Sequence, residues 1–318
     1  MSSIQHTGKV IITGQAHPLL AEGLSAMGYT VVDAPTISYS EVEASVKEVT
    51  GLVVTTRIAV DRSLLQKADQ LRWIARLGSG MELIDTDFAA QKGIRCFSSP
   101  EGNRLAVAEH ALGMLLSVLH RIDWSYREIQ QRIWLRNENR GVELSGQCVG
   151  IIGFGNTGSE LARLLAPFGV TVLANDIHKT GYGTDYIQEA TLEEIAARCS
   201  VISFHVPLNA GTKGMASTAF FDSLQLSPVL VNTSRGEVVD LPALVQALEK
   251  GQLSGAALDV LPNENLASYQ SDENQLLQRL IQRSNVVLTP HIAGYSRESF
   301  EKMSRVLLAK LREGTPDV

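Results

Sequence analysis

A glycine-rich turn between a predicted strand and a predicted helix constrains this chain more than any other feature. Residues 148–153 read CVGIIG, an apolar run typical of a buried strand, and they lead directly into GFGNTG at 153–158. A helical pattern follows over Ser159–Phe168, and a second apolar run then leads to Asp176. Strand, turn, helix and strand in this order predict the first unit of a parallel sheet.

Each glycine of this turn has a physical role in a dinucleotide site. Gly153 permits the tight turn, Gly155 lets the backbone approach a pyrophosphate, and Gly158 lets the helix pack close to the strand. The helix N-terminus offers N–H groups and a partial positive charge to phosphates. Asp176 stands 18 residues after Gly158, where a carboxylate accepts hydrogen bonds from a ribose and repels a 2′-phosphate. The pattern predicts NAD rather than NADP, a preference that Lys179 would weaken. The alternative is a purely structural turn.

Short apolar runs alternate with helical patterns along the whole chain, which predicts parallel sheets covered by helices. The strand candidates are Val10–Thr13, Thr30–Val32, Leu52–Thr55, Trp73–Arg76, Cys148–Gly153, Val170–Asn175, Val201–His205, Val229–Thr233, Gly255–Asp259 and Val286–Thr289. The helix candidates include Pro18–Met27, Tyr39–Glu48, Arg104–Leu119 with Asn103 as its N-cap, and Arg297–Arg312. The predicted fold class is α/β, and 318 residues suffice for two domains of roughly 100–200 residues each.

Composition and charge exclude several classes of protein. Hydrophobic residues make up 44% and charged residues 19%, which excludes wholesale disorder. A net charge of −6 gives no overall attraction to nucleic acid, and no apolar run reaches the roughly 20 residues of a membrane helix. The N-terminal residues lack the features of a signal peptide. Cys96, Cys148 and Cys199 form no CxxC pair, so we expect no disulfide framework, no metal site and a cytoplasmic location.

Polar side chains follow several predicted strands of the second half, where ligands of open α/β sheets bind. They are His205 and Pro207, then Thr233, Ser234 and Arg235, then Asp259 and Glu264, and finally His291. An acid, a base and a guanidinium on one sheet edge can move a proton and hold an anion beside a nicotinamide. The plainer alternatives are a surface ion pair for Arg235, a solvated loop acid for Glu264 and a packed structural histidine for His291. His205 is better explained as structural or cofactor-lining than as catalytic.

These segments resemble the D-isomer-specific 2-hydroxyacid dehydrogenase family, most of all its phosphoglycerate dehydrogenase-type members. The matching motifs are LGSG (77–80), LAVAEHALGMLL (105–116), GFGNTG (153–158), HVPL (205–208), NTSRGEVVD (232–240), ALDV with Glu264 (257–264) and TPHIAG (289–294). The resemblance implies two Rossmann-like doubly wound parallel-sheet domains with the active cleft between them. Both chain ends, residues 1–98 and 295–318, would form the substrate domain, and residues 99–294 the NAD-binding domain. It also implies a homodimer through the NAD-binding domain, with Ile122–Arg140 in the interface.

The resemblance further implies a role for each site residue. His291 would be the general base in hydroxyacid oxidation and the proton donor in ketoacid reduction, Glu264 would pair with it, and Arg235 would bind the substrate carboxylate or carbonyl oxygen. Asp259 would lie near the nicotinamide amide group. The implied cofactor-binding residues are Gly153, Gly155, Asn156, Thr157, Gly158, Asp176, His205, Val206, Pro207, Thr212, Thr233, Ser234, Arg235, Asp259, His291 and Gly294. The implied substrate-binding residues are Arg57, Arg76, Gly78, Ser79, Gly80 and Arg235.

The choice of substrate depends on a phosphate grip in the substrate domain. The resemblance favours 3-phosphoglycerate, which is oxidised to phosphohydroxypyruvate, as the leading single substrate. Thr55 and Ala59 stand where basic residues are usual in those members, so half of the grip is missing. The alternative substrates are hydroxypyruvate, glyoxylate or another small 2-ketoacid. After the predicted acid, Asn265 replaces a usual proline and a longer segment, Leu266–Arg283, precedes the last strand.

Two other functions are compatible with this fold. A dinucleotide-sensing regulatory protein would bind NAD and a protein partner, but it would not need Arg235, Glu264 and His291 together. A formate-oxidising enzyme would carry a glutamine in place of Glu264. The intact set of three residues therefore favours the hydroxyacid dehydrogenase.

Overall fold

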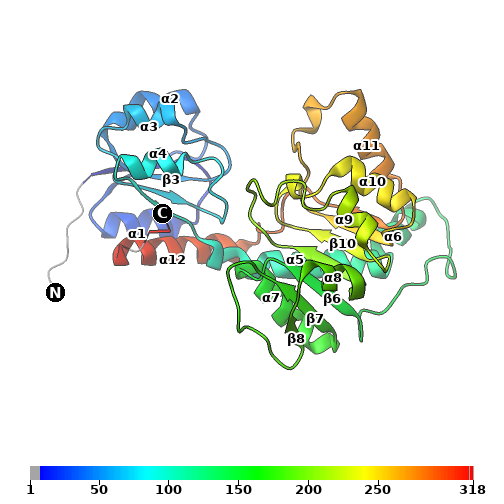
Figure 1. Cartoon of the computed structure of the whole chain (residues 1–318). Coiled ribbons are helices and arrows are strands. Elements are labelled where there is room, and N and C mark those ends of the chain that lie inside the picture. Colours follow the sequence, from blue (N-terminus) through cyan, green and yellow to red (C-terminus); the bar gives the residue numbers. More distant parts are fainter. Residues whose placement is uncertain (1–7, 315, 318) are drawn as a thin grey trace. The chain divides into compact units, whose positions relative to one another are not determined.

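A computed structural model of the chain describes residues 8–314, 316 and 317. The chain forms two compact units, which we call unit 1 (Met1–Arg104 and Tyr295–Val318) and unit 2 (Leu105–Gly294). Each unit is built on one parallel sheet with helices packed against it (Figure 1). This is the α/β class predicted from the alternation of strands and helices. The assignment of substrate binding to one unit and NAD binding to the other remains a prediction at this stage.

Unit 1 contains a five-stranded parallel sheet in the order β2-β1-β3-β4-β5. Its strands are β1 (Lys9–Ile12), β2 (Thr30–Asp33), β3 (Val49–Val54), β4 (Trp73–Arg76) and β5 (Arg95–Phe97). Its helices are α1 (Pro18–Ala26), α2 (Tyr39–Ser45), α3 (Arg62–Lys67), α4 (Thr86–Gln91) and α12 (Arg297–Glu313). α12 packs against α1, so this unit contains segments from both ends of the chain.

Unit 2 contains a seven-stranded parallel sheet in the order β12-β11-β10-β9-β6-β7-β8. Its strands are β6 (Cys148–Ile152), β7 (Thr171–Asn175), β8 (Ile187–Glu189), β9 (Val201–Phe204), β10 (Val229–Asn232), β11 (Gly255–Leu258) and β12 (Val286–Leu288). Its helices are α6 (Ile122–Gln130), α7 (Asn156–Leu165), α8 (Leu192–Arg198), α9 (Thr218–Ser223), α10 (Leu241–Glu249) and α11 (Ser271–Ile281), and α5 (Pro100–Leu119) leads into it from unit 1.

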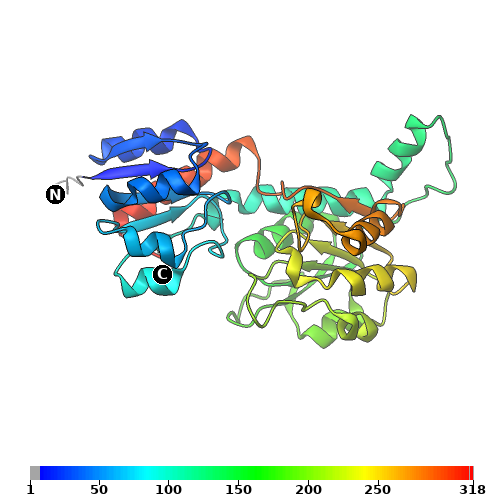
Figure 2. The same cartoon turned by 90° about the horizontal axis from the view of Figure 1, so that it is seen from above.

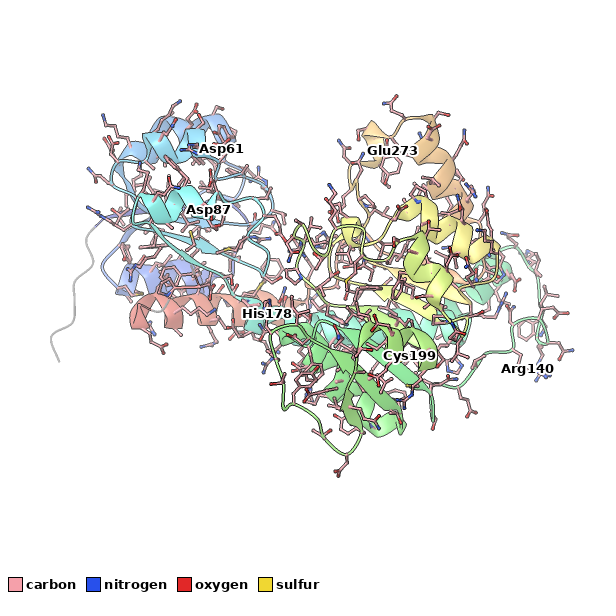
Figure 3. All side chains as sticks on the ribbon, viewed as in Figure 1. Asp61, Asp87, Arg140, His178, Cys199 and Glu273 are labelled. Atoms are coloured by element: carbon pink, nitrogen blue, oxygen red, sulfur yellow. The ribbon has the colours of Figure 1, made fainter. Side chains whose placement is uncertain are left out.

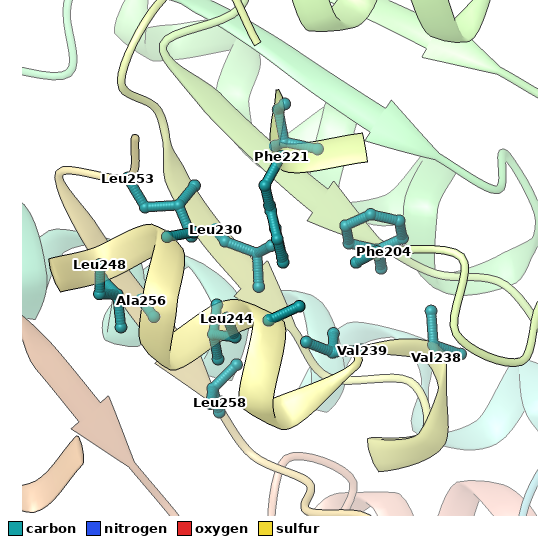
Figure 4. Packing of buried hydrophobic residues seen from close by; sticks show 14 of the residues in the cluster. Phe204, Phe221, Leu230, Val238, Val239, Leu244, Leu248, Leu253, Ala256 and Leu258 are labelled. Carbon is teal, nitrogen blue, oxygen red and sulfur yellow. The ribbon is translucent and has the colours of Figure 1, made fainter. Parts of the chain in front are cut away.

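The core of unit 2 fills both faces of its sheet. On β6, Val149 and Ile151 pack in one hydrophobic cluster, whereas Ile152 packs in another. Figure 4 shows part of the second cluster, to which α10 contributes Leu244 and β10 contributes Leu230. Burial on both faces is typical of parallel sheets that are covered by helices on each side.

The strands of this sheet end level with one another, and this places the candidate site. Neighbouring strands pair in register at Asn175, Ile152, Phe204, Asn232, Leu258 and Leu288, the last residues of β7, β6, β9, β10, β11 and β12. The residues that follow these strand ends therefore lie along a single edge of the sheet, as expected for a parallel fold.

Two helices begin earlier than the sequence predicts. α5 starts at Pro100 rather than Arg104, so Asn103 is not an N-cap but lies within the helix. Proline suits a first helical position because it has no N–H that needs a partner there. α7 starts at Asn156, with Gly155 as N-cap, so the helix N-terminus lies inside GFGNTG. The sequence does not predict β5 and β8, because their three-residue segments, RCF and IQE, contain charged residues and are too short to show a period-two pattern. The equally short β12, VVL, is predicted because it is an unbroken apolar run.

Three further findings concern membrane-spanning helices, metal sites and cysteines. Within residues 8–314, 316 and 317, no single helix is long and apolar enough to cross a membrane, although α5 and α6 pass that test as a pair bent by 61°. Among these same residues, no group of three or more His, Cys, Asp or Glu side chains could hold a metal ion. All three cysteines are free thiols, and the Sγ atoms of Cys148 and Cys199 lie 3.6 Å apart.

Candidate functional site

The glycine-rich turn after β6 has the conformation and the close packing that the sequence predicts. Gly153 has a φ of 94°, in the left-handed region that favours glycine. A Cβ atom on Gly158 would stand 2.1 Å from the carbonyl oxygen of Gly153, so a larger residue would force α7 away from the strand. At Gly155, by contrast, the position of a Cβ atom meets open space. This space adjoins the N-terminus of α7. Among the described residues, no side chain accepts a capping hydrogen bond from the N–H groups of that helix end.

Asp176 lies directly after β7 and is tied to the glycine-rich turn. One carboxylate oxygen accepts a hydrogen bond from the N–H of Phe154 at 2.9 Å. The other oxygen accepts from the N–H groups of His178 at 2.9 Å and Lys179 at 3.1 Å. The ammonium of Lys179 donates to the carbonyl oxygen of Phe154 at 3.0 Å. The structure thus holds this carboxylate beside the glycine-rich turn, directly after β7.

His205 is a buried, neutral histidine behind the same turn. Its Nε2 atom lies 2.8 Å from the hydroxyl oxygen of Ser203, and its Nδ1 atom lies 3.2 Å from that of Thr157 in α7. Burial lowers the pKa of His205 to about 4, because the buried ring loses the hydration of its charged form. These contacts suit the structural or cofactor-lining role rather than proton transfer. After His205, the Thr212 hydroxyl holds the loop by donating to the Pro207 carbonyl oxygen at 2.6 Å.

The turn after β10 carries Arg235 and contains an unpaired hydroxyl. The buried side chain of Asn232 organises this turn, since its oxygen accepts from the N–H of Ser234 at 3.0 Å and its amide donates to the Arg235 carbonyl oxygen at 2.9 Å. The Arg235 guanidinium donates to the carbonyl oxygen of Ser234 at 2.7 Å. The buried hydroxyl oxygen of Thr233 has no hydrogen-bond partner among the described residues. Buried polar atoms normally have a partner, so a bound ligand that supplies one fits this position.

Glu264 and His291 are in direct contact. The Nδ1 atom of His291 lies 2.8 Å from Oε1 and 2.9 Å from Oε2 of Glu264. Both side chains are partly open to solvent, with 37% of the histidine and 47% of the glutamate exposed. The backbone of His291 has a φ of 55°, which is rare for a residue with a side chain and marks a constrained turn.

A buried carboxylate holds that turn in place. Asp259 accepts hydrogen bonds from the N–H groups of Ile292 and Ala293, each at 2.9 Å, and from the Thr289 hydroxyl at 2.5 Å. Nε2 of His110 lies 3.0 Å from the same hydroxyl and 3.5 Å from Asp259. Burial by itself would raise the pKa of Asp259, but the hydrogen bonds from His110, Thr289 and the two N–H groups outweigh it and lower the pKa.

Three residues of this arrangement, Asn232, His110 and Thr289, were not among the predicted site residues. His110 gave a signal in the sequence, since it is a polar residue on the apolar face of α5. Asn232 and Thr289 end or follow buried strands, as the predicted residues do. Their partners lie on other segments, however, and no sequence pattern shows those contacts.

The predicted substrate-binding residues of unit 1 are mostly engaged by the chain itself. The N–H of Gly78 donates to the Ser99 hydroxyl at 3.0 Å, while Ser79 is exposed and Gly80 partly so. The guanidinium of Arg76 is buried and donates to the carbonyl oxygen of Leu77. That of Arg57 donates to four backbone carbonyl oxygens, those of Thr13 and of residues 35–37, at 2.5–3.4 Å.

Comparison of the sequence with known proteins and family models finds dehydrogenases in each case. A family model described as D-isomer specific 2-hydroxyacid dehydrogenase, NAD binding domain, matches residues 112–293. D-3-phosphoglycerate dehydrogenase of Haemophilus influenzae is 31% identical over 297 residues, which cover 93% of this chain and 72% of that protein. D-3-phosphoglycerate dehydrogenase of Homo sapiens is 30% identical over 293 residues, which cover 92% of this chain and 53% of that protein. The chain thus spans between 53% and 72% of the length of these two relatives.

Solved structures match along almost the whole chain. D-lactate dehydrogenase of Aquifex aeolicus, complexed with NAD and lactic acid, has a TM-score of 0.82 and 26% identity, and the match covers 96% of this chain and 95% of that one. An NADPH-dependent glyoxylate/hydroxypyruvate reductase of Sinorhizobium meliloti, complexed with NADP and malonate, has a TM-score of 0.79 and 28% identity, with coverage of 96% and 92%.

Proposed function

This chain belongs to the D-isomer-specific 2-hydroxyacid dehydrogenase family, and on that basis we propose that it transfers hydride between NAD(H) and a D-2-hydroxyacid or its 2-ketoacid. The contact between His291 and Glu264 is the observation that carries this proposal. It joins an imidazole and a carboxylate that follow neighbouring strands, β12 and β11. Proton transfer to or from the substrate oxygen needs such a pair.

The proton moves through the histidine ring. Because Nδ1 of His291 bonds to Glu264, Nε2 is the atom that exchanges a proton with the substrate oxygen. In ketoacid reduction the imidazolium form of His291 donates this proton to the carbonyl oxygen, and in hydroxyacid oxidation the neutral ring accepts it. Glu264 holds the ring in place through its contact with Nδ1. The Arg235 guanidinium holds the substrate carboxylate or carbonyl oxygen and polarises it as charge develops.

NAD fits the residues of the nucleotide site. The open space at Gly155 and the N-terminus of α7 suit a pyrophosphate, Asp176 suits the hydroxyls of a ribose, and the buried hydroxyl of Thr233 has a hydrogen bond to give. When bound, the nicotinamide supplies the hydride acceptor in oxidation and the donor in reduction. The chain's contribution is to hold it and to place His291 and Arg235 beside the substrate.

Two substrate classes follow from different observations. The identity to D-3-phosphoglycerate dehydrogenases favours phosphohydroxypyruvate. The four carbonyl contacts of Arg57, together with Thr55 and Ala59 at the other grip positions, favour an unphosphorylated ketoacid such as hydroxypyruvate or glyoxylate. A guanidinium bonded to carbonyl oxygens must give up those bonds before it can hold a phosphate.

The test is an NADH-oxidation assay with purified protein on phosphohydroxypyruvate and hydroxypyruvate at matched concentrations. A kcat/KM at least tenfold higher for the phosphorylated compound indicates a working phosphate site. Equal or reversed preference indicates a general 2-ketoacid reductase. NADH binding without turnover of these compounds or of glyoxylate contradicts the proposal and favours the dinucleotide-sensing alternative.

The role of His291 is tested by His291→Ala. We expect turnover to fall by about 10²–10⁴-fold, the usual contribution of general acid–base catalysis. The Kd for NADH, followed by fluorescence, should stay within about twofold and serves as the control for folding. Turnover near that of the unmodified protein removes His291 from the mechanism.

We also propose that the partner of this chain is a second copy of itself. No residue of α6 is buried, and Ile122, Tyr126 and Ile129, spaced to share one helix face, are 56%, 61% and 47% exposed. Trp134, just beyond this helix, is 77% exposed. Apolar side chains gathered in this way on a projecting element are typical of a protein–protein interface. A cytoplasmic location is part of the same proposal and rests on the three free thiols.

A further inference from the structure

Glu264 lies on a segment without regular structure, between the end of β11 and a short 3-10 helix at Leu266–Ser268. Its side chain is 47% exposed, so little packing restrains it. Ordering a long, exposed side chain and its backbone costs conformational entropy. The contact with His291 therefore depends on other groups that fix this segment.

Asn263, the residue before Glu264, is fixed through both its side chain and its backbone. Its side-chain oxygen accepts from the N–H of Asn265 at 3.1 Å, which closes a turn around Glu264. Its carbonyl oxygen accepts from the Tyr269 hydroxyl at 2.6 Å. Its side-chain amide donates to the Ser268 hydroxyl at 3.1 Å and to Oε1 of Glu273 at 3.0 Å. Each side-chain group of Asn263 therefore has a partner, and the chain is held on either side of Glu264.

Glu273 joins this turn to a helix. It is the third residue of α11, and its Oε2 atom accepts from the N–H of Gln270 at 3.0 Å as part of the helix capping box. Its Oε1 atom accepts from Asn263, and the two hydrogen bonds, that from Asn263 first, lower the pKa of Glu273. Figure 3 labels Glu273 at one end of α11. The carboxylate thus bonds to the helix with one oxygen and to the Glu264 segment with the other.

We propose that Asn263 and Glu273 are positioning residues that set the orientation of Glu264 and, through it, of His291. They act on the proton-transfer pair without touching the substrate. This inference rests on the proposed function, because it assigns to these residues the geometry of the same His291–Glu264 contact.

The first experiment compares Asn263→Ala, Glu264→Gln and the double variant, with hydroxypyruvate and NADH as probes. We expect Asn263→Ala to lower kcat about tenfold, while KM for hydroxypyruvate and Kd for NADH stay within twofold. In the Glu264→Gln background, Asn263→Ala should lower kcat by less than a further twofold, because the residue through which it acts is already altered.

A charge exchange provides the conservative rescue. Asn263→Asp alone places two carboxylates in contact and should lower kcat at least as much as Asn263→Ala. Adding Glu273→Gln restores a donor toward position 263 while the new amide oxygen still accepts from Gln270. The double variant should therefore regain kcat to within about threefold of the unmodified protein. Amide hydrogen exchange over residues 262–270 should rise in the single variants and return in the rescued one.

The outcomes distinguish a failure of the proposed acid–base pair from a failure of the positioning role alone. Unchanged turnover in Glu264→Gln contradicts the proposed acid–base pair itself. A large loss in Glu264→Gln with unchanged kcat and hydrogen exchange in Asn263→Ala overturns only the positioning role. Equal losses from Asn263→Ala in both backgrounds, or a charge exchange that rescues neither kcat nor hydrogen exchange, also overturn it. If the probe is not turned over, hydrogen exchange still decides whether Asn263 and Glu273 order the segment.

Discussion

At the scale of single residues, two histidines that look alike in the sequence have opposite environments. His205 and His291 each stand just beyond a buried strand. His205 is buried between the hydroxyls of Ser203 and Thr157, whereas His291 lies partly exposed against Glu264. The difference comes from the neighbours that the fold supplies, since burial removes hydration from one ring and a carboxylate contacts the other.

Because His205 is buried, we expect the free energy of unfolding to fall when the solution is acidified. The pKa of His205 is lowered from 6.5 to about 4 in the folded chain. Between these two values the unfolded state binds more protons than the folded state, so the free energy of unfolding falls as the pH falls. The full effect is about 3 kcal/mol, of which about 2 kcal/mol is lost between pH 7.5 and pH 5.

Urea unfolding at these two pH values measures this effect. In His205→Gln the difference in unfolding free energy between them should shrink by about 2 kcal/mol. His178→Gln, which changes an exposed histidine of the same unit, is the matched control and should leave the difference unaltered. The same pH dependence in both variants would contradict the assignment of the effect to His205.

At the scale of elements, the joint between β6 and α7 combines a packing requirement with an open space. Gly158 lies in the helix against the Gly153 carbonyl oxygen, where a side chain cannot fit. Gly155 has ordinary backbone angles, with a φ of −81°, and adjoins open space. Gly158 is therefore required by the fold itself, whereas nothing in the packing of the described residues requires a glycine at position 155.

Alanine substitutions separate these two requirements. Gly158→Ala should lower the free energy of unfolding by about 1–3 kcal/mol, the usual cost of forcing an extra group into a packed interior. Gly155→Ala should change it by less than about 0.5 kcal/mol. Its Cβ atom would occupy the space predicted for the pyrophosphate, however, so the Kd for NADH should rise at least tenfold. Thermal unfolding and fluorescence titration check the pair. Normal NADH binding by Gly155→Ala would remove the pyrophosphate from this position.

At the scale of the whole molecule, the chain uses its C-terminal segment to complete unit 1 and leaves α6 uncovered. α12 packs against α1, and the Asp317 side chain accepts from the backbone N–H and hydroxyl of Ser98 and from Lys310. In contrast, α6 projects away from the sheet of unit 2 in Figure 2, and the chain after it loops outward in Figure 1. An amphipathic helix without buried residues gains stability when a partner covers its apolar face.

The oligomeric state tests this interpretation. We expect the chain to run as a dimer, at twice its mass of 34.5 kDa, in light scattering coupled to size-exclusion chromatography. Tyr126→Glu combined with Ile129→Glu should shift it to the monomer, because two charges would be buried without partners. Leu226→Glu, at an exposed apolar residue of the same unit, is the control and should remain dimeric. A monomeric unmodified protein, or a dimeric double variant, would contradict the proposed interface.

Much of the nucleotide site can be predicted from the sequence, because local backbone demands restrict residue types. Three such demands fall within 24 residues, 153–176. They are a turn with positive φ at Gly153, a close approach of backbone to helix at Gly158, and an acid after the next strand. The apolar runs predict ten of the twelve strands of the described chain and miss β5 and β8, two of the three strands that have only three residues. The candidate pair Glu264 and His291 also follows from strand-end position, although the sequence alone cannot show that the two touch.

The fold class and the polar groups along one sheet edge follow from local sequence, because residue type reflects burial, turn conformation and charge over short stretches of chain. Which groups hold those side chains in place follows only from the folded structure. His110 meets Thr289 across 179 positions of the chain, Arg57 donates to carbonyl oxygens of two separate segments, and Asn263 reaches Glu273 over the start of a helix. Such contacts depend on how folded segments lie beside one another in space, and no local pattern in the sequence encodes them.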